Sequence, residues 1–357
     1  MNTLPTEYRQ FKGVTAAELG YDTQFLDTHY YEWESQAGQR LGVYSAEPTA
    51  GADVSRPTII MPASHDYRLE PLWMRRMDIL AKRANAKVVG VEAPGTVGLL
   101  QASEQGEWTV YDDHAPLSGA RQTPAQLAAA LRGDFSRHVD TQLQAVAETV
   151  GLTPSERIAL FGESMGAAFA IDALRISRER QLNISDVILY ESVNTFSGRK
   201  PLRPLQLAKV LPATENDRRN QYFEENEVIG HPMVAFEMAS PEQAALDAAR
   251  KSIGQQGVVS AAYGLGLATG RFDVLRQGMV LYPDARVDLV RGADSLATQR
   301  GEYEALTDAL TADGVEAAAF EVTDARGEQA IGHAHLVSLG RMALVADWLD
   351  GRLRRTT

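Results

Sequence analysis

The sequence contains no cysteine among its 357 residues. A chain without cysteine forms no disulfide, offers no thiolate nucleophile and cannot build a cysteine-ligated zinc site. This absence is compatible with the cytoplasm, which is the location we expect. No apolar run approaches the roughly 18 residues that would indicate a membrane span. The N-terminus, MNTLPTEYRQFKGV, also lacks the basic head and apolar stretch of a signal peptide.

The chain has no excess of basic residues either. Its 35 Lys and Arg stand against 47 Asp and Glu, which gives a net charge of −12. A sequence-independent nucleic-acid surface needs clustered Lys and Arg, so we expect no nucleic-acid partner. A hydrophobic fraction of 44% with 23% charged residues is typical of a globular protein. The length allows one large α/β domain with an insertion, or two modest domains.

In its first half the chain alternates short apolar runs with helical patterns. Two early strands joined by a hairpin are predicted by HYYEWES and RLGVYSA. A strand, a helix and a second strand are then predicted by TIIMPAS, LWMRRMDILAKRA and KVVGVEAPG. A β-α-β unit of this length implies parallel pairing. Residues 104–122 are polar and rich in turn residues, and we expect a surface loop there.

A long helix is predicted after this loop. Thr123 is the expected N-cap, and Pro124 suits the first helical position. Apolar residues then recur every three or four positions as one continuous stripe to Val150. A second strand–helix–strand unit follows, with RIALFG and DVILYES as its strands.

Strand-like runs vanish over residues 194–281, where the pattern becomes helical and irregular. Alternation resumes with RVDLVRGADS, a helix through Tyr303, the strand VEAAAFEVT and a final helix that Gly351 would end. That helix carries one apolar side: Leu336, Leu339, Met342, Val345 and Leu349. We therefore predict an α/β fold with a mostly parallel central sheet flanked by helices. Its divisions are an N-terminal extension (1–27), a first core part (28–193), a helical insertion (194–281) and a second core part (282–357).

Residues 162–166, GESMG, place a serine between two glycines where a strand becomes a helix. A serine hydroxyl is a weak nucleophile that must be exposed to both a base and a substrate carbonyl. A sharp strand-to-helix turn provides this exposure, and glycines two residues away relieve the crowding that the turn creates. The following helix directs its N-terminal N–H groups toward developing negative charge. A bare G-x-S-x-G match is also typical of a glycine-rich packing turn, but its placement favours the nucleophile elbow.

A serine nucleophile needs a histidine to take its proton and an acid to orient that histidine. In enzymes with this elbow, the acid and then the histidine follow the serine along the chain. Four of the seven histidines precede Ser164, and His231 precedes any later strand that could hold the acid. Only His333 and His335 remain. Asp294 follows the apolar run RVDLV, where a parallel sheet presents functional groups, although a turn or N-cap aspartate would fit this position equally well.

These motifs together resemble the α/β-hydrolase superfamily, from about residue 28 to 353. The resemblance is carried by GESMG, by VEAPG at 91–95, by RGADS at 291–295 and by GHAHL at 332–336. It implies that Ser164 is the nucleophile, Asp294 the acid and His333 the base. The family's base commonly follows a glycine, which favours His333 over His335 as the base. An H-x-H pair also occurs in metal sites, but no acidic cluster accompanies this one, and we expect no metal and no cofactor.

One departure from the family concerns the oxyanion hole. The family has His-Gly after its third strand, whereas this chain has IIMPASHDYR. We expect the amides of Met165 and Ser64 to hold the oxyanion, and His65 either lines the mouth of the site or is a polar loop residue. The insertion occupies the family's place for a cap. Its apolar residues would line a pocket or, more simply, form the cap's own core: Tyr222, Phe223, Met233, Phe236 and Met238.

The resemblance implies a serine esterase acting on a small acyl substrate. GxSMG resembles esterases and monoacylglycerol-type lipases, and that substrate inference is analogy alone. Three alternatives stay open: cleavage of a peptide, thioester or lactone bond, an acyltransferase, and a non-catalytic ligand-binding member of the fold. The sequence leaves open whether the protein is a monomer or a homo-oligomer.

Overall fold

The structure is a computed structural model of the chain. It describes residues 9–10, 28–48, 55–62, 71–94, 100–102, 108–110, 122–206, 262, 265–293, 295, 297–322 and 339–354.

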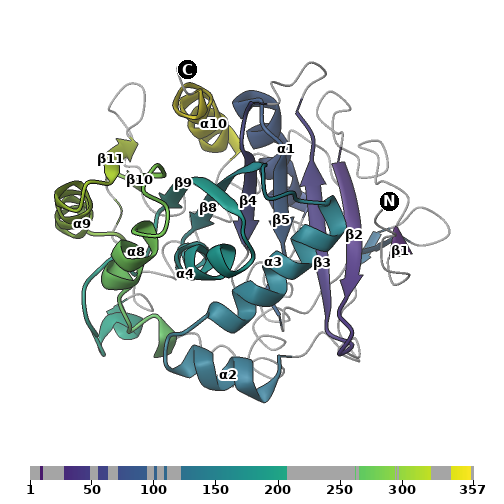
Figure 1. Cartoon of the computed structure of the whole chain (residues 1–357), viewed down its shortest axis with the longest axis horizontal. Coiled ribbons are helices and arrows are strands. Elements are labelled where there is room, and N and C mark those ends of the chain that lie inside the picture. The colour runs from purple at the N-terminus through teal and green to yellow at the C-terminus, as the bar shows by residue number, and fades with distance from the viewer. Residues whose placement is uncertain are drawn as a thin grey trace, which may run out of the picture.

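A nine-stranded sheet organises the described residues, with the strand order β1-β2-β3-β5-β4-β8-β9-β10-β11 (Figure 1). Its strands are β1 (Arg9–Gln10), β2 (Thr28–Glu34), β3 (Arg40–Ala46), β4 (Thr58–Pro62), β5 (Val88–Val91), β8 (Arg157–Glu163), β9 (Asn183–Tyr190), β10 (Arg286–Gly292) and β11 (Glu316–Val322). The strands from β5 through β11 in this order pair in parallel. β1, β2 and β3 add antiparallel strands at one edge. The mostly parallel sheet predicted from the sequence is therefore confirmed.

Helices cover both faces of this sheet (Figure 1). They are α1 (Pro71–Ala84), α2 (Pro124–Leu131), α3 (Ser136–Val150), α4 (Gly166–Glu179), α8 (Phe272–Met279), α9 (Arg300–Ala312) and α10 (Leu339–Leu353). One core packs α3, α4, α8 and α9 against the sheet, and a second core packs α1 and α10 against the opposite face. Successive residues of a strand point to opposite faces of the sheet and so belong to alternate cores. Leu160 lies in the first core and Phe161 in the second. Burial on both faces explains why the parallel strands read as continuous apolar runs.

The segment 104–122, predicted to be one loop, contains a short strand. β7 (Trp108–Val110) pairs antiparallel with β6 (Leu100–Ala102) in a separate two-stranded sheet. The loop prediction is wrong for those three residues. A strand of three residues is too short to show an apolar–polar alternation in the sequence.

The helix predicted over 124–150 is two helices, α2 and α3. Gly133 lies between them with φ of +75°, a left-handed conformation that cannot continue an α-helix. A Cβ at this position would lie 2.8 Å from the Cβ of Thr269, so a segment distant in the sequence also requires glycine there. The start was predicted correctly, because Thr123 caps α2 and forms a capping box with Gln126.

The final helix continues past its predicted stop. α10 runs through Gly351 to Leu353, whose side chain is buried together with Val345 and Leu349. Glycine inside a helix costs only about 1 kcal/mol relative to alanine, so this buried apolar face outweighs it. Leu336, which was predicted to start this face, lies outside the described residues.

Two features bear on the predicted divisions of the chain. β1 lies in the predicted N-terminal extension and pairs with β2. α8 lies in the predicted insertion, and its Leu275 and Met279 join the core around α4. Most of the insertion, residues 207–261, and the pocket-lining residues predicted within it lie outside the described residues. The boundaries of the divisions stay a prediction.

One ion pair joins β9 to β10 near their amino ends, and a second joins β10 to the end of α10. Arg286 donates from Nε to Asp186 Oδ1 over 2.9 Å, and Arg352 donates from Nη2 to Asp288 Oδ1 over 2.7 Å. Both aspartates are buried, and burial raises the pKa of Asp288. The contact of Arg352 with Asp288 fixes the end of the last helix near the amino end of β10.

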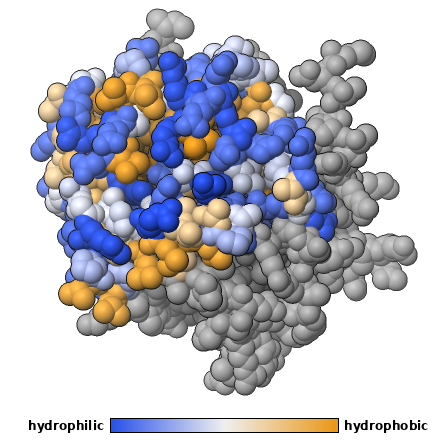
Figure 2. Space-filling model, turned by 60° about the horizontal axis from the view of Figure 1, so that its bottom comes forward, coloured by the Kyte–Doolittle hydropathy of each residue, from blue (hydrophilic) through white to orange (hydrophobic). Residues whose placement is uncertain are grey.

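The described surface mixes polar and apolar residues, as Figure 2 shows for one face. Its exposed large apolar side chains are Leu131, Leu202, Leu205, Leu265, Val280 and Leu281. Among the described helices, none is long and apolar enough to cross a membrane.

Candidate active site

Ser164 lies at the turn between β8 and α4, where the sequence predicts the nucleophile. Its φ is +50°, a conformation that residues other than glycine rarely adopt. Its amide donates to the carbonyl of Tyr190 over 2.8 Å, and its own carbonyl accepts from the amide of Ala167 over 3.3 Å. The side chain is partly exposed. The structure therefore places Ser164 in a sharp, strained strand-to-helix turn.

Gly162 is required by the close packing of α4 on β8. A Cβ at residue 162 would lie 2.5 Å from the Cα of Ala167 and 2.7 Å from the Cβ of Ala170. Both contacts are shorter than folded proteins allow, and the first is with backbone. The small residues at the start of α4 bring the helix near enough for the turn to form.

The N-terminus of α4 lies directly after Ser164. Met165 is the N-cap residue of this helix, no side chain caps it, and its first turn has no acidic residue. The dipole of a helix favours negative charge near its N-terminus. The use of the Met165 amide as an oxyanion donor stays a prediction.

The other predicted site residues lie outside the described residues: Ser64, His65, Asp294, His333 and His335. The strands that precede them are described. Tyr190 in β9 pairs with Glu163 in β8 and with Val290 in β10, so these three strands end at nearly the same level. β4 and β11 run parallel to them and end toward the same edge. The segments that carry the predicted acid, base and second oxyanion donor therefore leave the sheet at the edge that holds Ser164.

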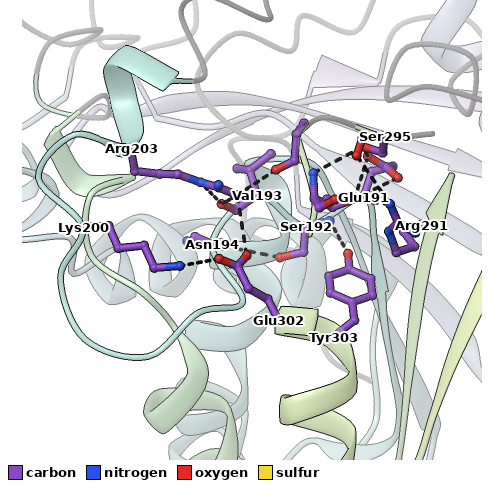
Figure 3. A network of polar contacts seen from close by, with 12 residues as sticks. Glu191, Ser192, Val193, Asn194, Lys200, Arg203, Arg291, Ser295, Glu302 and Tyr303 are labelled. Carbon is purple, nitrogen blue, oxygen red and sulfur yellow. Dashed lines mark hydrogen bonds and ion pairs between the residues drawn. The ribbon is translucent and has the colours of Figure 1, made fainter. Parts of the chain in front are cut away.

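Glu191 directly follows β9 at this edge, and it is not among the site residues predicted from the sequence. Its φ is +52°, and its side chain is fully buried. The carboxylate accepts from the Gly292 amide over 2.5 Å and from the Ser295 hydroxyl over 2.6 Å. The Thr298 hydroxyl lies 3.3 and 3.4 Å from its two oxygens. Figure 3 shows Glu191 beside Ser295 and Arg291 in this network.

A signal for Glu191 was present in the sequence. It follows the apolar run DVILY as Asp294 follows RVDLV, and acidic residues after parallel strands meet at one edge of a sheet. What the sequence could not show is its set of partners, which lie about one hundred positions later along the chain.

Cationic and aromatic side chains complete the network around Glu191. Arg291 donates from Nη2 to the carbonyls of Ala293, Ser295 and Thr298 over 3.2 to 3.4 Å, and its other amino group pairs with Glu321. Tyr303 accepts from the amide of Ser192 over 2.8 Å. Burial, and then the negative charge of Glu191, raise the pKa of the Tyr303 hydroxyl well above its ordinary value.

A buried ion pair ties α1 to the elbow. Arg76 Nη2 lies 2.5 Å from an oxygen of Glu163, and both side chains are less than one-tenth exposed. Glu163 directly precedes Ser164, and α1 follows residues 63–70, which include the predicted oxyanion donor Ser64. This pair connects the turn at Ser164 to the helix after that segment.

A second polar cluster lies further along α4, between α3 and α8. Asp172 accepts from the amide of Phe135 over 2.8 Å and lies 3.2 Å from Arg271 Nη2. Burial raises the pKa of Asp172 to about 6, against the opposing effect of Arg271. The cluster borders a cavity of about 260 Å³ that Asp134 and Arg175 also line.

No cluster of three or more His, Asp or Glu suited to a metal ion occurs within the part of the chain that the structure describes. His333 and His335 are not in that part.

The class of fold follows from these observations. A mostly parallel sheet with helices on both faces carries a serine on a strained strand-to-helix turn, and this arrangement is typical of the α/β-hydrolase fold. The chain has the α/β-hydrolase fold.

No protein-family model and no curated protein matches the sequence. Solved structures do resemble it. A serine hydrolase from the polyaromatic-hydrocarbon-degrading bacterium Cycloclasticus zankles is 12% identical, with a TM-score of 0.49 over 92% of this chain and 100% of that chain. A thioesterase domain from the curacin biosynthetic pathway is 14% identical, with a TM-score of 0.49 over 91% and 99%. An α/β hydrolase from the metagenome of Lake Arreo, Spain, is 13% identical, with a TM-score of 0.47 over 94% and 85%. These values are low, and the sheet and elbow of the chain itself define its fold.

Proposed function

We propose that the chain is a serine hydrolase that cleaves a carboxylic ester of a small molecule through an acyl-enzyme on Ser164. The observation that supports this most is the backbone of Ser164, strained at φ of +50° between β8 and α4. A strained non-glycine residue costs stability, and such residues cluster at functional sites. The partly exposed side chain and the N-terminus of α4 beside it suit an attacking hydroxyl.

In the proposed reaction, His333 takes the proton of Ser164 as its Oγ attacks the ester carbonyl carbon. The amides of Met165 and Ser64 donate to the oxyanion of the tetrahedral intermediate. His333 then gives its proton to the leaving alcohol as the ester C–O bond breaks. His333 then deprotonates a water molecule that attacks the acyl-enzyme, and returns this proton to Ser164 Oγ as the acyl C–O bond breaks and the acid is released. Asp294 orients His333 and stabilises its charged form.

Labelling with a fluorophosphonate probe tests this proposal. We expect the folded wild-type protein to be labelled at neutral pH and the Ser164→Ala variant not to be labelled. His333→Ala should slow labelling and ester hydrolysis by about 10³-fold or more, because the base is lost. His335→Ala should leave both nearly unchanged.

A panel of short- and long-chain esters, thioesters, amides and lactones identifies the bond that is cleaved. Hydrolysis of esters alone supports the ester proposal, and preference for another acyl bond replaces it with another hydrolase. A folded wild-type protein that is neither labelled nor active on the panel contradicts the proposal and favours a ligand-binding member of the fold.

A further inference from the structure

The segment 292–298, which includes Asp294, is anchored at its described residues. The amide of Gly292 donates to Glu191, and the amide of Ala293 donates to the carbonyl of Val322 over 3.1 Å. The hydroxyl of Ser295 donates to Glu191, and its amide donates to the carbonyl of Gly292 over 3.1 Å. The chain is therefore held on both sides of Asp294.

Two charged side chains anchor this segment, one as a hydrogen-bond acceptor and the other as a donor. The carboxylate of Glu191 is a pure acceptor, and it takes the segment's N–H and O–H donors. The guanidinium of Arg291 is a pure donor, and it serves the carbonyls of Ala293, Ser295 and Thr298. Arg203 adds a bond of 2.7 Å to the carbonyl of Ala297. Figure 3 shows Glu191 directly after β9, Arg291 on β10 and Arg203 further along the chain from β9.

Burying the charged side chains of Glu191 and Arg291 costs free energy, so we expect the arrangement to have a role. Glu191 is fully buried and Arg291 is 6% exposed. Buried charged groups are tolerated when they are well hydrogen-bonded, and a simpler loop would need neither. Glu191 also holds a left-handed backbone next to the strained Ser164, since the amide of Ser164 donates to the residue before Glu191.

We propose that Glu191 and Arg291 are positioning residues: they hold the described residues on both sides of Asp294 and so support its proposed role as the acid. This inference rests on the proposed function. It assigns Glu191 no direct role as the acid, because both of its oxygens already accept from donors of the segment.

The test is Glu191→Gln, which keeps the shape of the side chain and removes its charge and one acceptor oxygen. We expect kcat on an active ester to fall about 10- to 100-fold with little change in KM, because a misplaced acid weakens the chemical step more than substrate binding. We also expect the acidic limb of the kcat/KM profile to move to lower pH. An acid that no longer stabilises the imidazolium of His333 lets the pKa of that histidine fall. A purely structural role would not move this limb.

Asp186→Asn is the matched control. Asp186 is a buried carboxylate on the same strand, β9, with its own arginine and serine partners at the opposite end of the sheet. This variant should lose stability and keep both kcat and the pH profile. If Glu191→Gln does not fold, Ser295→Ala removes one donor to Glu191 and should give a smaller change in the same direction.

Two results would overturn the inference while the wild type stays active and labelled. One is a folded Glu191→Gln with wild-type kcat and an unmoved pH profile. The other is a Glu191→Gln as inactive as Ser164→Ala beside an Asp294→Asn of nearly normal activity, which would make Glu191 the acid itself. An unlabelled, inactive wild type would instead contradict the proposed function.

Discussion

Ser164 and Glu191 adopt left-handed backbone conformations directly after the neighbouring strands β8 and β9. Each such residue costs on the order of 1–3 kcal/mol, which the surrounding fold must offset. The hydrogen bond from the amide of Ser164 to the carbonyl of Tyr190 joins the two turns. Strain is thus found at the sheet edge where the proposed chemistry takes place.

Gly162→Ala tests how closely the elbow depends on its packing. The added methyl group would lie 2.5 Å from the Cα of Ala167, so α4 must shift. We expect a loss of about 1–3 kcal/mol in the free energy of unfolding, measured by denaturant titration. Labelling of Ser164 by the fluorophosphonate probe should also slow.

Gly301→Ala is the control for that substitution. Gly301 lies in α9, and a Cβ there meets no atom within 4 Å. It should be neutral or stabilise the protein by up to about 1 kcal/mol, with normal labelling. Equal effects of the two substitutions would contradict the packing role of Gly162.

The roles of single residues could be predicted from the sequence where the residues they depend on lie close by in the chain. Thr123 was recognisable as a cap because its partner lies three residues away. Ser164 was recognisable because its glycines and helix adjoin it. Glu191 and the pair of Arg76 with Glu163 were not recognised, because their partners meet only after strands and helices from distant segments pack together.

Among the elements, the contact between α3, α4 and α8 depends on one buried carboxylate. Asp172 on α4 holds the amide of Phe135 at the start of α3 and pairs with Arg271 before α8. Asp134 and Arg175 are the other charged groups that act on it. Because burial raises the pKa of Asp172 from 3.8 to about 6, the folded state binds its proton more tightly than the unfolded state does.

Stability should therefore fall as pH rises through Asp172's window, from about pH 4 to about pH 6. Asp172→Asn removes this titration and keeps an acceptor for Phe135. We expect the free energy of unfolding of the wild type minus that of the variant to decrease across the window, by up to about 3 kcal/mol for a shift of roughly two units. Denaturant unfolding at a series of pH values measures this difference. A difference that grows with rising pH would contradict the raised pKa.

The order of strands and helices was largely predictable, because alternating apolar runs and helical stripes are local patterns. The break at Gly133 was not, since a left-handed glycine and its contact with Thr269 depend on a distant segment. The continuation of α10 past Gly351 was also missed, because the burial of Leu353 outweighs a local stop signal.

On the scale of the whole molecule, the parallel sheet has a carboxyl edge and an amino edge, where its strands end and begin, and the two carry different polar networks. The carboxyl edge holds Ser164 and the Glu191 network. The amino edge holds the ion pair of Asp186 with Arg286, which joins β9 to β10, and that of Asp288 with Arg352, which fastens the end of α10. Asp288 precedes the last residue of β10 by four positions, or roughly 13 Å along a strand.

Arg352→Gln should lower the stability of the protein and leave its labelling rate nearly unchanged. It removes the charged partner of the buried Asp288 and the cation above the ring of Phe320. We expect the free energy of unfolding to fall by about 1–3 kcal/mol, since the buried carboxylate of Asp288 loses its charged partner. The rate of fluorophosphonate labelling at 25 °C should stay within about twofold of wild type, and a tenfold loss would show that the two edges are coupled.

The attachment of α10 to the amino edge has a practical consequence. A tether joined beyond the end of this helix starts from the side of the sheet away from Ser164. Immobilising the protein on a bead or sensor chip through its C-terminus would therefore leave the proposed reaction face turned toward solution.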